Sequence, residues 1–168
     1  SGLKLFGKDV PKFAAKDFDE IKRPIDYLGL NMYTSYSWKR GRDGKPERVS
    51  WPAGYPRATV DWLPVVPDTL YWGSRFFHER FKLPIAITEN GTATRDQVFL
   101  DGKVHDPQRI DFMHRYLLGV ARAVKENIPI MGYWAWSLLD NFEWADGYKE
   151  RFGLVYVDFQ NQRRIPKD

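Results

Sequence analysis

Apolar runs that end in polar side chains recur along the chain and predict three β-strands. The runs cover residues 25–33, 83–91 and 128–136, and between them apolar side chains recur at helical spacing over residues 67–82 and 107–126. This alternation of strand and helix predicts parallel strands joined by right-handed crossovers, and therefore an α/β fold.

The central run, residues 83–91, is the most informative of the three. Pro84 opens it, its isoleucines favour an extended backbone, and Gly91 supplies the turn that closes it. Glu89 therefore stands at the carboxyl end of a buried strand. Chemistry collects at that end in parallel α/β folds, so Glu89 is a candidate nucleophile or base. A Glu that caps the next turn or pairs with an arginine is the alternative.

The helical spacing also predicts which side chains face the sheet. For residues 67–82 the expected buried face consists of Leu70, Gly73, Ser74, Phe77 and Phe81. For residues 107–126 the expected inner stripe consists of Ile110, Met113, Leu117, Ala121 and Val124. Asp106 is expected to cap the second helix ahead of Pro107, and Asn127 to end it in the left-handed conformation.

The remaining segments are less regular. Residues 1–22 predict a turn and a short helix, and residues 151–159 predict a short extended segment. Residues 36–66 predict an irregular loop of unusual length, and such loops are usually functional. Basic residues concentrate at positions 39–48, which we expect to be solvated. The aromatic residues of the long loop either pack it against the scaffold or line a cleft: Trp38, Trp51, Tyr55 and Trp62.

Composition narrows the classes of function. The 168 residues carry a net charge of +4, but basic and acidic residues are interleaved, so we expect no nucleic-acid partner. The chain has no cysteine, which is compatible with a cytoplasmic location. No apolar run approaches the ~20 residues of a membrane helix, so we expect no membrane association. The three histidines lack a metal-binding spacing, and we expect neither a metal nor a cofactor.

Polar and aromatic side chains follow all three predicted strands. Asn31 and Tyr33 end the first strand, Glu89 ends the second, and Trp136 ends the third. Carboxylates and amides bind sugar hydroxyls, and an indole face covers the C–H face of a pyranose. The set therefore predicts a carbohydrate pocket. Phosphate binding is disfavoured, because no glycine-rich phosphate loop or arginine cluster lies at these strand ends.

A further carboxylate and a further indole, Glu143 and Trp144, lie on the loop after the third strand. Glycoside hydrolysis normally uses two carboxylates, about 5–5.5 Å apart in retaining enzymes and about 6.5–9.5 Å apart in inverting enzymes. Glu89 is a candidate for one of them. Glu143 or Asp140 is the candidate for the other.

Several longer motifs resemble the carboxyl-terminal part of glycoside hydrolase family 1 β-glucosidases. These motifs are Asn31-Met32-Tyr33-Thr34, Ile87-Thr88-Glu89-Asn90-Gly91, Trp136-Ser137-Leu138-Leu139-Asp140-Asn141-Phe142-Glu143-Trp144, Arg151-Phe152-Gly153-Leu154 and Arg163-Arg164-Ile165-Pro166-Lys167. Their order and spacing agree with the family over nearly the whole chain. The resemblance implies that residues 1–168 are the carboxyl-terminal portion of a single domain, a (β/α)8 TIM barrel, and that they supply about strands 6–8 of it.

The resemblance also implies roles for individual side chains in a retaining mechanism. Glu89 would be the nucleophile, Tyr33 its hydrogen-bond partner, and Asn31 part of the polar wall near the 2-hydroxyl of the sugar. The other implied contacts are Trp136 beneath the sugar ring, Glu143 on the 4- and 6-hydroxyls, Trp144 on the 3-hydroxyl, Trp62 beside the aglycone and Phe152 at the far side of the glycone pocket. For Trp62 and Phe152, ordinary packing is the alternative.

The sequence departs from the family pattern in two ways. Met32 stands where many relatives have a tyrosine. The acid/base glutamate of the family lies in a Thr-x-Asn-Glu-Pro motif, and no Asn-Glu-Pro occurs in this sequence. We therefore expect a complementing amino-terminal barrel chain to supply the acid/base glutamate, and the isolated chain to be inactive.

The substrate that the resemblance implies is a β-glucoside or cello-oligosaccharide with a terminal non-reducing β-D-glucosyl residue, as in cellulose degradation. The alternatives are a non-catalytic carbohydrate-binding fragment, a thioglucosidase, and a β-galactosidase or β-fucosidase of the same family. Relatives that hydrolyse phospho-sugars replace the position of Glu143 with a small hydroxyl residue. Glu143 therefore favours an unphosphorylated sugar.

Overall fold

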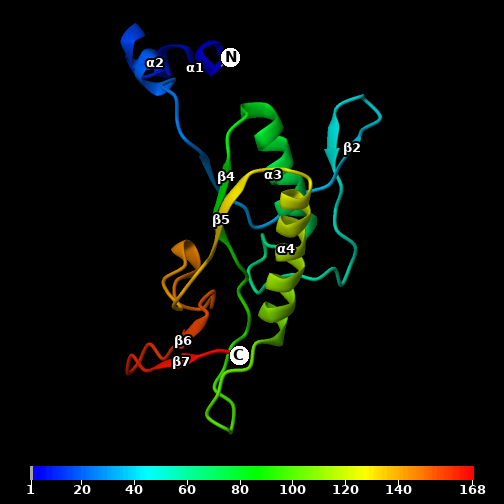
Figure 1. Cartoon of the computed structure of the whole chain (residues 1–168), viewed down its shortest axis with the longest axis vertical. Coiled ribbons are helices and arrows are strands. Elements are labelled where there is room, and N and C mark those ends of the chain that lie inside the picture. The colour runs from blue at the N-terminus through cyan, green and yellow to red at the C-terminus, as the bar shows by residue number, and fades with distance from the viewer. Residues whose placement is uncertain (1) are drawn as a thin grey trace.

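A computed structural model describes residues 2–168 and places three parallel strands at the centre of the molecule (Figure 1). Strands β1 (Leu28–Asn31), β4 (Ile85–Asn90) and β5 (Ile130–Ala135) form one sheet in the order β1-β4-β5. Helix α3 (Asp68–Phe81) precedes β4, and helix α4 (Pro107–Lys125) lies between β4 and β5 in the chain. The predicted order of elements and the parallel pairing are confirmed.

Both helices end where the backbone turns left-handed. Lys82 follows α3 with a φ of 58°, and Asn127 lies just beyond α4 with a φ of 63°, so the prediction for Asn127 is confirmed. Pro107 opens α4, as predicted. Asp106 occupies the N-cap position, as predicted, but its side chain makes no capping hydrogen bond and pairs with Arg109 instead.

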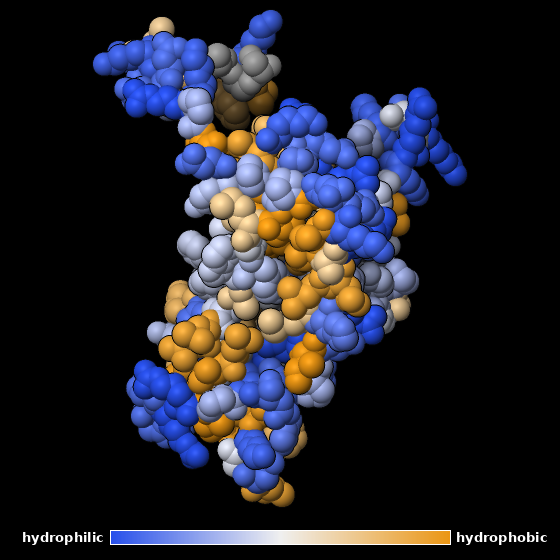
Figure 2. Space-filling model, in the orientation of Figure 1, coloured by the Kyte–Doolittle hydropathy of each residue, from blue (hydrophilic) through white to orange (hydrophobic). Residues whose placement is uncertain are grey.

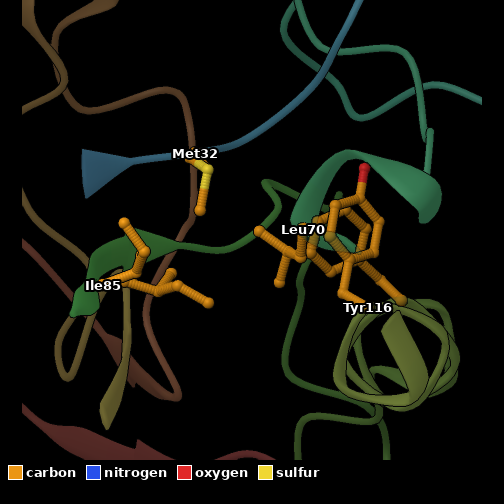
Figure 3. Packing of buried hydrophobic residues seen from close by; sticks show 6 residues of the cluster. Met32, Leu70, Ile85 and Tyr116 are labelled. Atoms are coloured by element: carbon orange, nitrogen blue, oxygen red, sulfur yellow. The ribbon is translucent and has the colours of Figure 1, made fainter. Parts of the chain in front are cut away.

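Apolar side chains from the sheet and from both helices form the main core (Figure 3). Ile85 lies on β4 and Met32 directly follows β1, while Leu70 and Tyr116 come from α3 and α4. The Tyr116 ring stacks on Phe112 with 3.9 Å between the ring centroids. Burial of a large apolar side chain contributes about 1.5–3 kcal/mol. This core therefore holds both helices against one face of the sheet.

The buried stripe of α4 is not the predicted one. The buried residues of this helix are Arg109, Phe112, Tyr116 and Ala123. Of the predicted stripe, the exposed members are Ile110, Leu117, Ala121 and Val124. Apolar residues occupy two adjoining stripes of α4, and spacing alone does not decide which stripe faces the sheet. On α3, Phe81 is likewise exposed, and Tyr71 is buried.

The sheet is uncovered on the face opposite the core. Side chains alternate across a strand, so Ala86 and Thr88 point away from the helices that cover Ile85. They line a shallow hollow together with Tyr27, Met131 and Trp134. Met131 and Trp134 are 60% and 56% exposed, and β1 and β5 are the edge strands of the sheet. Figure 2 shows further hydrophobic residues at the surface over α4.

The long loop contains a hairpin that the sequence pattern did not predict. Strands β2 (Trp38–Arg40) and β3 (Pro46–Arg48) pair antiparallel, and the hairpin projects from the rest of the molecule (Figure 1). Across it, Lys39 Nζ lies 3.1 Å from Glu47 Oε1. All residues of both strands are exposed. The expected solvation is therefore correct, and the expected irregular backbone is wrong here.

The chain on either side of the sheet forms smaller elements. Helices α1 (Gly2–Phe6), η1 (Gly7–Asp9) and α2 (Ala15–Ile21) precede the sheet, in agreement with the predicted short helix. After the sheet come η2 (Trp144–Asp146) and an antiparallel pair, β6 (Val155–Val157) with β7 (Arg164–Pro166). In residues 2–168, no helix is long and apolar enough to span a membrane. Over the same range, no group of three or more His, Cys, Asp or Glu side chains could hold a metal ion.

Candidate active site

Glu89 lies near the end of β4, where the strand register pairs it with Asn31 of β1. The Tyr33 hydroxyl donates a 2.7 Å hydrogen bond to Glu89 Oε2. Burial, followed by this hydrogen bond and the charges of Glu89 and Glu143, raises the pKa of Tyr33 well above its usual value. The hydroxyl therefore keeps its proton and remains a donor to the carboxylate.

The residues around Glu89 form a pocket of about 390 Å³. Apart from Ala145, its walls consist of carboxylates and aromatic rings, namely Tyr33, Trp62, Glu89, Glu143, Trp144, Asp146 and Phe152. The Tyr33 ring makes edge-to-face contacts with Trp62 at 5.6 Å and with Phe152 at 6.2 Å between centroids. Six of the eight predicted site residues are therefore brought together. Carboxylates beside aromatic rings provide both the hydrogen-bond acceptors and the apolar surfaces that a sugar ring needs.

The other two predicted residues, Asn31 and Trp136, do not line this pocket. Asn31 Oδ1 accepts a 2.7 Å hydrogen bond from Thr88 Oγ1. Trp136 is partly buried and packs against a small core cluster that includes Phe152. A hydrogen bond from its side chain favours the charged form of Glu143. Trp136 therefore reaches the pocket through its contacts with Phe152 and Glu143.

The backbone segments that directly follow β4 and β5 approach each other closely at Gly91. A Cβ atom on Gly91 would lie 1.9 Å from the carbonyl oxygen of Trp136. Trp136 N–H in turn donates a 2.8 Å hydrogen bond to the carbonyl oxygen of Asn90. Only glycine permits this backbone contact, which places the loop after β5 beside Glu89.

Glu143 is a partly buried carboxyl group in this pocket. Burial is the main cause that raises its pKa, and the negative charges of Asp146, Glu89 and Glu150 act in the same direction. The hydrogen bond from Trp136 opposes this shift. Glu143 therefore holds a proton more readily than an exposed glutamate does.

Asp140, the other carboxylate that the sequence offered as a second catalytic acid, is not available for that role. Its side chain is 0% exposed and accepts hydrogen bonds from Arg151 at 2.7 Å and Lys167 at 2.9 Å. The amide of Gly153 donates to Oδ1 at 2.9 Å and the amide of Val157 donates to Oδ2 at 3.3 Å. With both oxygens occupied by donors, Asp140 cannot approach a substrate. This candidate is wrong.

Residues 3–168 match the model of glycosyl hydrolase family 1. The chain belongs to glycosyl hydrolase family 1. It is 43% identical over 161 residues to a 1,4-β-D-glucan glucohydrolase of Thermotoga neapolitana, covering 95% of this chain and 36% of that protein. It is 42% identical to β-glucosidase A of Thermotoga maritima, again with 95% and 36% coverage. It is 41% identical to a bifunctional β-D-glucosidase/β-D-fucosidase of Bifidobacterium breve, with 90% and 37% coverage.

Solved structures give the same result for the fold of this family 1 chain. The β-glucosidase of Thermotoga maritima in complex with castanospermine superposes with a TM-score of 0.86 at 39% identity, over 99% of this chain and 38% of that one. The chain thus spans little more than a third of the length of these relatives. Strands β1, β4 and β5 with helices α3 and α4 are part of a family 1 TIM barrel.

Some residues that shape this family 1 site were missed from the sequence. Buried Asn90 donates a 2.7 Å hydrogen bond to the carbonyl oxygen of Met32 and accepts one of 2.9 Å from the Tyr133 hydroxyl. It thereby joins all three strands directly beside Glu89. Its position next to Glu89 at a strand end was the available signal. Asp146 also lines the pocket, and no sequence feature marked it.

A larger cavity of about 850 Å³ lies elsewhere on the family 1 chain, between residues 56–65 and residues 92–112. None of the predicted site residues lines it. Its lining carries side chains of both charge signs, such as Arg57 and Asp61. The smaller pocket around Glu89 is therefore the candidate active site.

Proposed function

We propose that this chain carries the nucleophile and the sugar-holding side of a retaining β-glycosidase that acts on terminal non-reducing β-D-glucosyl residues. The observation that carries the proposal is the Glu89 carboxylate, which accepts a hydrogen bond from Tyr33 in a pocket lined by indoles and two further carboxylates. Membership of family 1 and the names of the relatives support the reaction class.

In the proposed reaction, a Glu89 oxygen attacks the anomeric carbon and the bond to the leaving oxygen breaks. The leaving oxygen takes a proton from an acid, and water then hydrolyses the glycosyl ester at Glu89. The Tyr33 hydroxyl keeps the attacking carboxylate oriented. Asn31 forms the polar wall near the 2-hydroxyl.

The sugar is held by side chains on the loop after β5 and around it. Glu143 accepts hydrogen bonds from the 4- and 6-hydroxyls, and Trp144 donates its indole N–H to the 3-hydroxyl. Trp136 provides the apolar surface beneath the ring. Trp62 flanks the aglycone, and Phe152 closes the far side of the pocket. The substrates are a β-glucoside or a cello-oligosaccharide.

We assign the acid/base glutamate to a complementing amino-terminal part that supplies the other barrel strands, with residues 1–168 as about strands 6–8. Two observations support this assignment. The sheet has two edge strands, and Met131 and Trp134 are exposed on its uncovered face. Such edges and apolar faces are suited to pairing with further strands. In a closed barrel these side chains face the interior.

The proposal is tested by complementation. The chain is combined with the amino-terminal portion of β-glucosidase A of Thermotoga maritima that it does not match, and release of phenol from an aryl β-glucoside is measured. We expect turnover from the combination and none from either part alone. The variant Glu89→Gln is expected to abolish turnover in the same combination. If the chain alone were as active as the combination, the acid/base glutamate could not come from the amino-terminal portion.

A non-catalytic carbohydrate-binding fragment is the second candidate, because Glu143 and Trp144 could hold a sugar without turnover. An activated 2-deoxy-2-fluoro-β-glucoside separates the two functions, since it traps the glycosyl ester and needs no acid to release its leaving group. Peptide mass analysis of the combined barrel is expected to show the label on Glu89. Sugar binding without a label, and without turnover, would establish the binding function instead.

A further inference from the structure

Six charged side chains that do not line the candidate active site form a network almost fully shielded from solvent. They are Asp96, Asp106, Arg109, Asp140, Arg151 and Lys167. Three are cations and three are anions, so the network is electrically neutral. Apart from Arg151, at 17%, each of these side chains is at most 3% exposed. Charges buried this deeply are tolerated only when every one has partners.

Lys167 joins the two halves of this network by ion pairs on both sides, and Arg109 adds a second link by donating a 2.8 Å hydrogen bond to the carbonyl oxygen of Arg151. The Lys167 ammonium group lies 2.5 Å from Asp96 Oδ2 and 2.9 Å from Asp140 Oδ1. Asp96 follows β4, the strand that carries Glu89, and Asp140 follows β5. Lys167 itself comes directly after β7. One cation therefore connects the loops that follow two neighbouring strands of the sheet.

Each side of this bridge is fixed to other parts of the molecule. Arg109 at the start of α4 lies 2.7 Å from Asp96 Oδ2 and also donates to the Thr94 hydroxyl at 2.7 Å. On the other side, the amide of Gly153 donates to Asp140. The bridge is therefore anchored to α4 and to the segment that contributes Phe152 to the pocket.

Asp140 stands three residues before Glu143 on the same loop, and Phe152 lies next to Gly153. Both Glu143 and Phe152 line the pocket, whereas Lys167 and Asp140 do not. Displacement of Asp140 would move the pocket wall that carries Glu143 relative to Glu89. A misplacement of about 1 Å is sufficient to reduce catalysis ~100-fold.

We propose that Lys167 is a positioning residue for the sugar-holding loop: by bridging Asp96 and Asp140 it sets where Glu143 lies relative to Glu89. This inference rests on the proposed glycosidase function. Lys167 touches neither the substrate nor the reacting atoms. Its contribution is to the geometry of the pocket wall.

The test compares two substrates in the complemented barrel, an aryl β-glucoside and the aryl β-xyloside that lacks the 6-hydroxymethyl group. Loss of folded protein lowers kcat/KM for both substrates equally, so the ratio of the two values reports only the pocket. For Lys167→Met we expect the glucoside-to-xyloside ratio to fall about tenfold, because the contact of Glu143 with the 6-hydroxyl is weakened. Lys167→Arg, which keeps the charge, is expected to restore much of the ratio.

Two further variants keep the test decisive when Lys167→Met folds poorly. The double variant Asp96→Asn, Lys167→Met removes one charge of each sign and leaves the network neutral, yet the bridge is still missing. We expect it to fold better than the single variant and to retain the lowered ratio. Lys45→Met is the matched control, because Lys45 is exposed on the hairpin and its one ion pair within residues 2–168 is with Asp43. It is expected to leave the ratio unchanged.

Hydrogen exchange on the chain itself separates this inference from the proposed function. The amides of Gly153 and Val157 donate to Asp140, so they are expected to exchange faster in Lys167→Met than in the wild-type chain or in Lys45→Met. If these amides exchange faster in Lys167→Met but no complemented barrel turns over substrate, the bridging role of Lys167 is supported and the glycosidase function is rejected. An unchanged substrate ratio in an active barrel, or unchanged exchange, would overturn the positioning role.

Discussion

The Tyr33 hydroxyl lies 2.7 Å from Glu89 Oε2 and is held in its neutral, donating form by burial and by the neighbouring carboxylates. The two residues are 56 positions apart in sequence and come from the ends of adjacent strands. The hydrogen bond therefore depends on the sheet being formed. It links the fold directly to the chemistry proposed for Glu89.

Tyr33→Phe removes this donor and keeps the ring. A hydrogen bond to a charged group contributes about 1.5–3 kcal/mol, so we expect kcat/KM for an aryl β-glucoside in the complemented barrel to fall roughly 10- to 100-fold. The edge-to-face contacts of the ring with Trp62 and Phe152 are retained, so the unfolding temperature is expected to change little. Steady-state kinetics with a parallel thermal melt checks both. Wild-type kinetics in this variant would show that the hydroxyl has no role in the reaction.

Thr88 fixes the orientation of the Asn31 amide, because its hydroxyl occupies Asn31 Oδ1 and leaves the amide N–H groups for other partners. Thr88→Val has the same shape without the donor and is expected to lower kcat/KM several-fold. Thr88→Ser keeps the hydroxyl and is expected to restore most of the activity. An Asn31→Ala background provides the control: there the Thr88→Val substitution is expected to have no further effect. Equal losses in both backgrounds would contradict the proposed coupling.

Gly91→Ala places a Cβ atom 1.9 Å from a backbone oxygen of Trp136, and neither backbone can move without breaking strand pairing. We expect a loss of about 2 kcal/mol or more in the free energy of unfolding. Gly29→Ala is the matched control, because the nearest atom to its Cβ is the Thr88 methyl carbon at 3.2 Å, part of a side chain that can shift. Urea denaturation of the two variants compares them. Similar midpoints would show that the Gly91 contact is not tight.

The raised pKa of Glu143 predicts how stability depends on pH. The folded chain binds the Glu143 proton more tightly than the unfolded chain does, so this group stabilises the fold at acidic pH. Its contribution is lost as the pH rises from about 4 through the raised pKa of the folded state. Glu143→Gln is therefore expected to gain stability relative to wild type as the pH rises, by less than about 1 kcal/mol because the group is partly exposed. Thermal melts of Glu143→Gln and wild type at pH 4 and pH 7 measure this difference in stability. A variant that is stabilised relative to wild type only at pH 4 would contradict the prediction.

Sequence reasoning succeeded where the signal is local. The strand that carries Glu89 and the helix that begins at Pro107 have local start and stop signals in the sequence. The aromatic members of the pocket, Glu89 and Glu143 could also be named, because they lie at or beyond strand ends in a pattern that resembles the family, whereas Asp146 could not. Their convergence then follows from parallel pairing, which brings the ends of the strands to one edge of the sheet.

Sequence reasoning failed where long-range packing decides the outcome. The buried stripe of α4 includes Arg109, which pairs with Asp96 on another segment and lies outside the apolar pattern. The role of Asp140 was equally hidden, since its partner Lys167 lies 27 residues away. Neither pairing has a periodicity that a reader of the sequence could detect.

The uncovered face of the sheet has a practical consequence. Met131 and Trp134 on that face, and the free backbone groups of the edge strands, offer each copy of the chain a surface to which a second copy can adhere. Protein concentration is therefore a variable in every solution experiment on the unaccompanied chain, and melting temperatures or exchange rates are comparable only between samples of matched dilution.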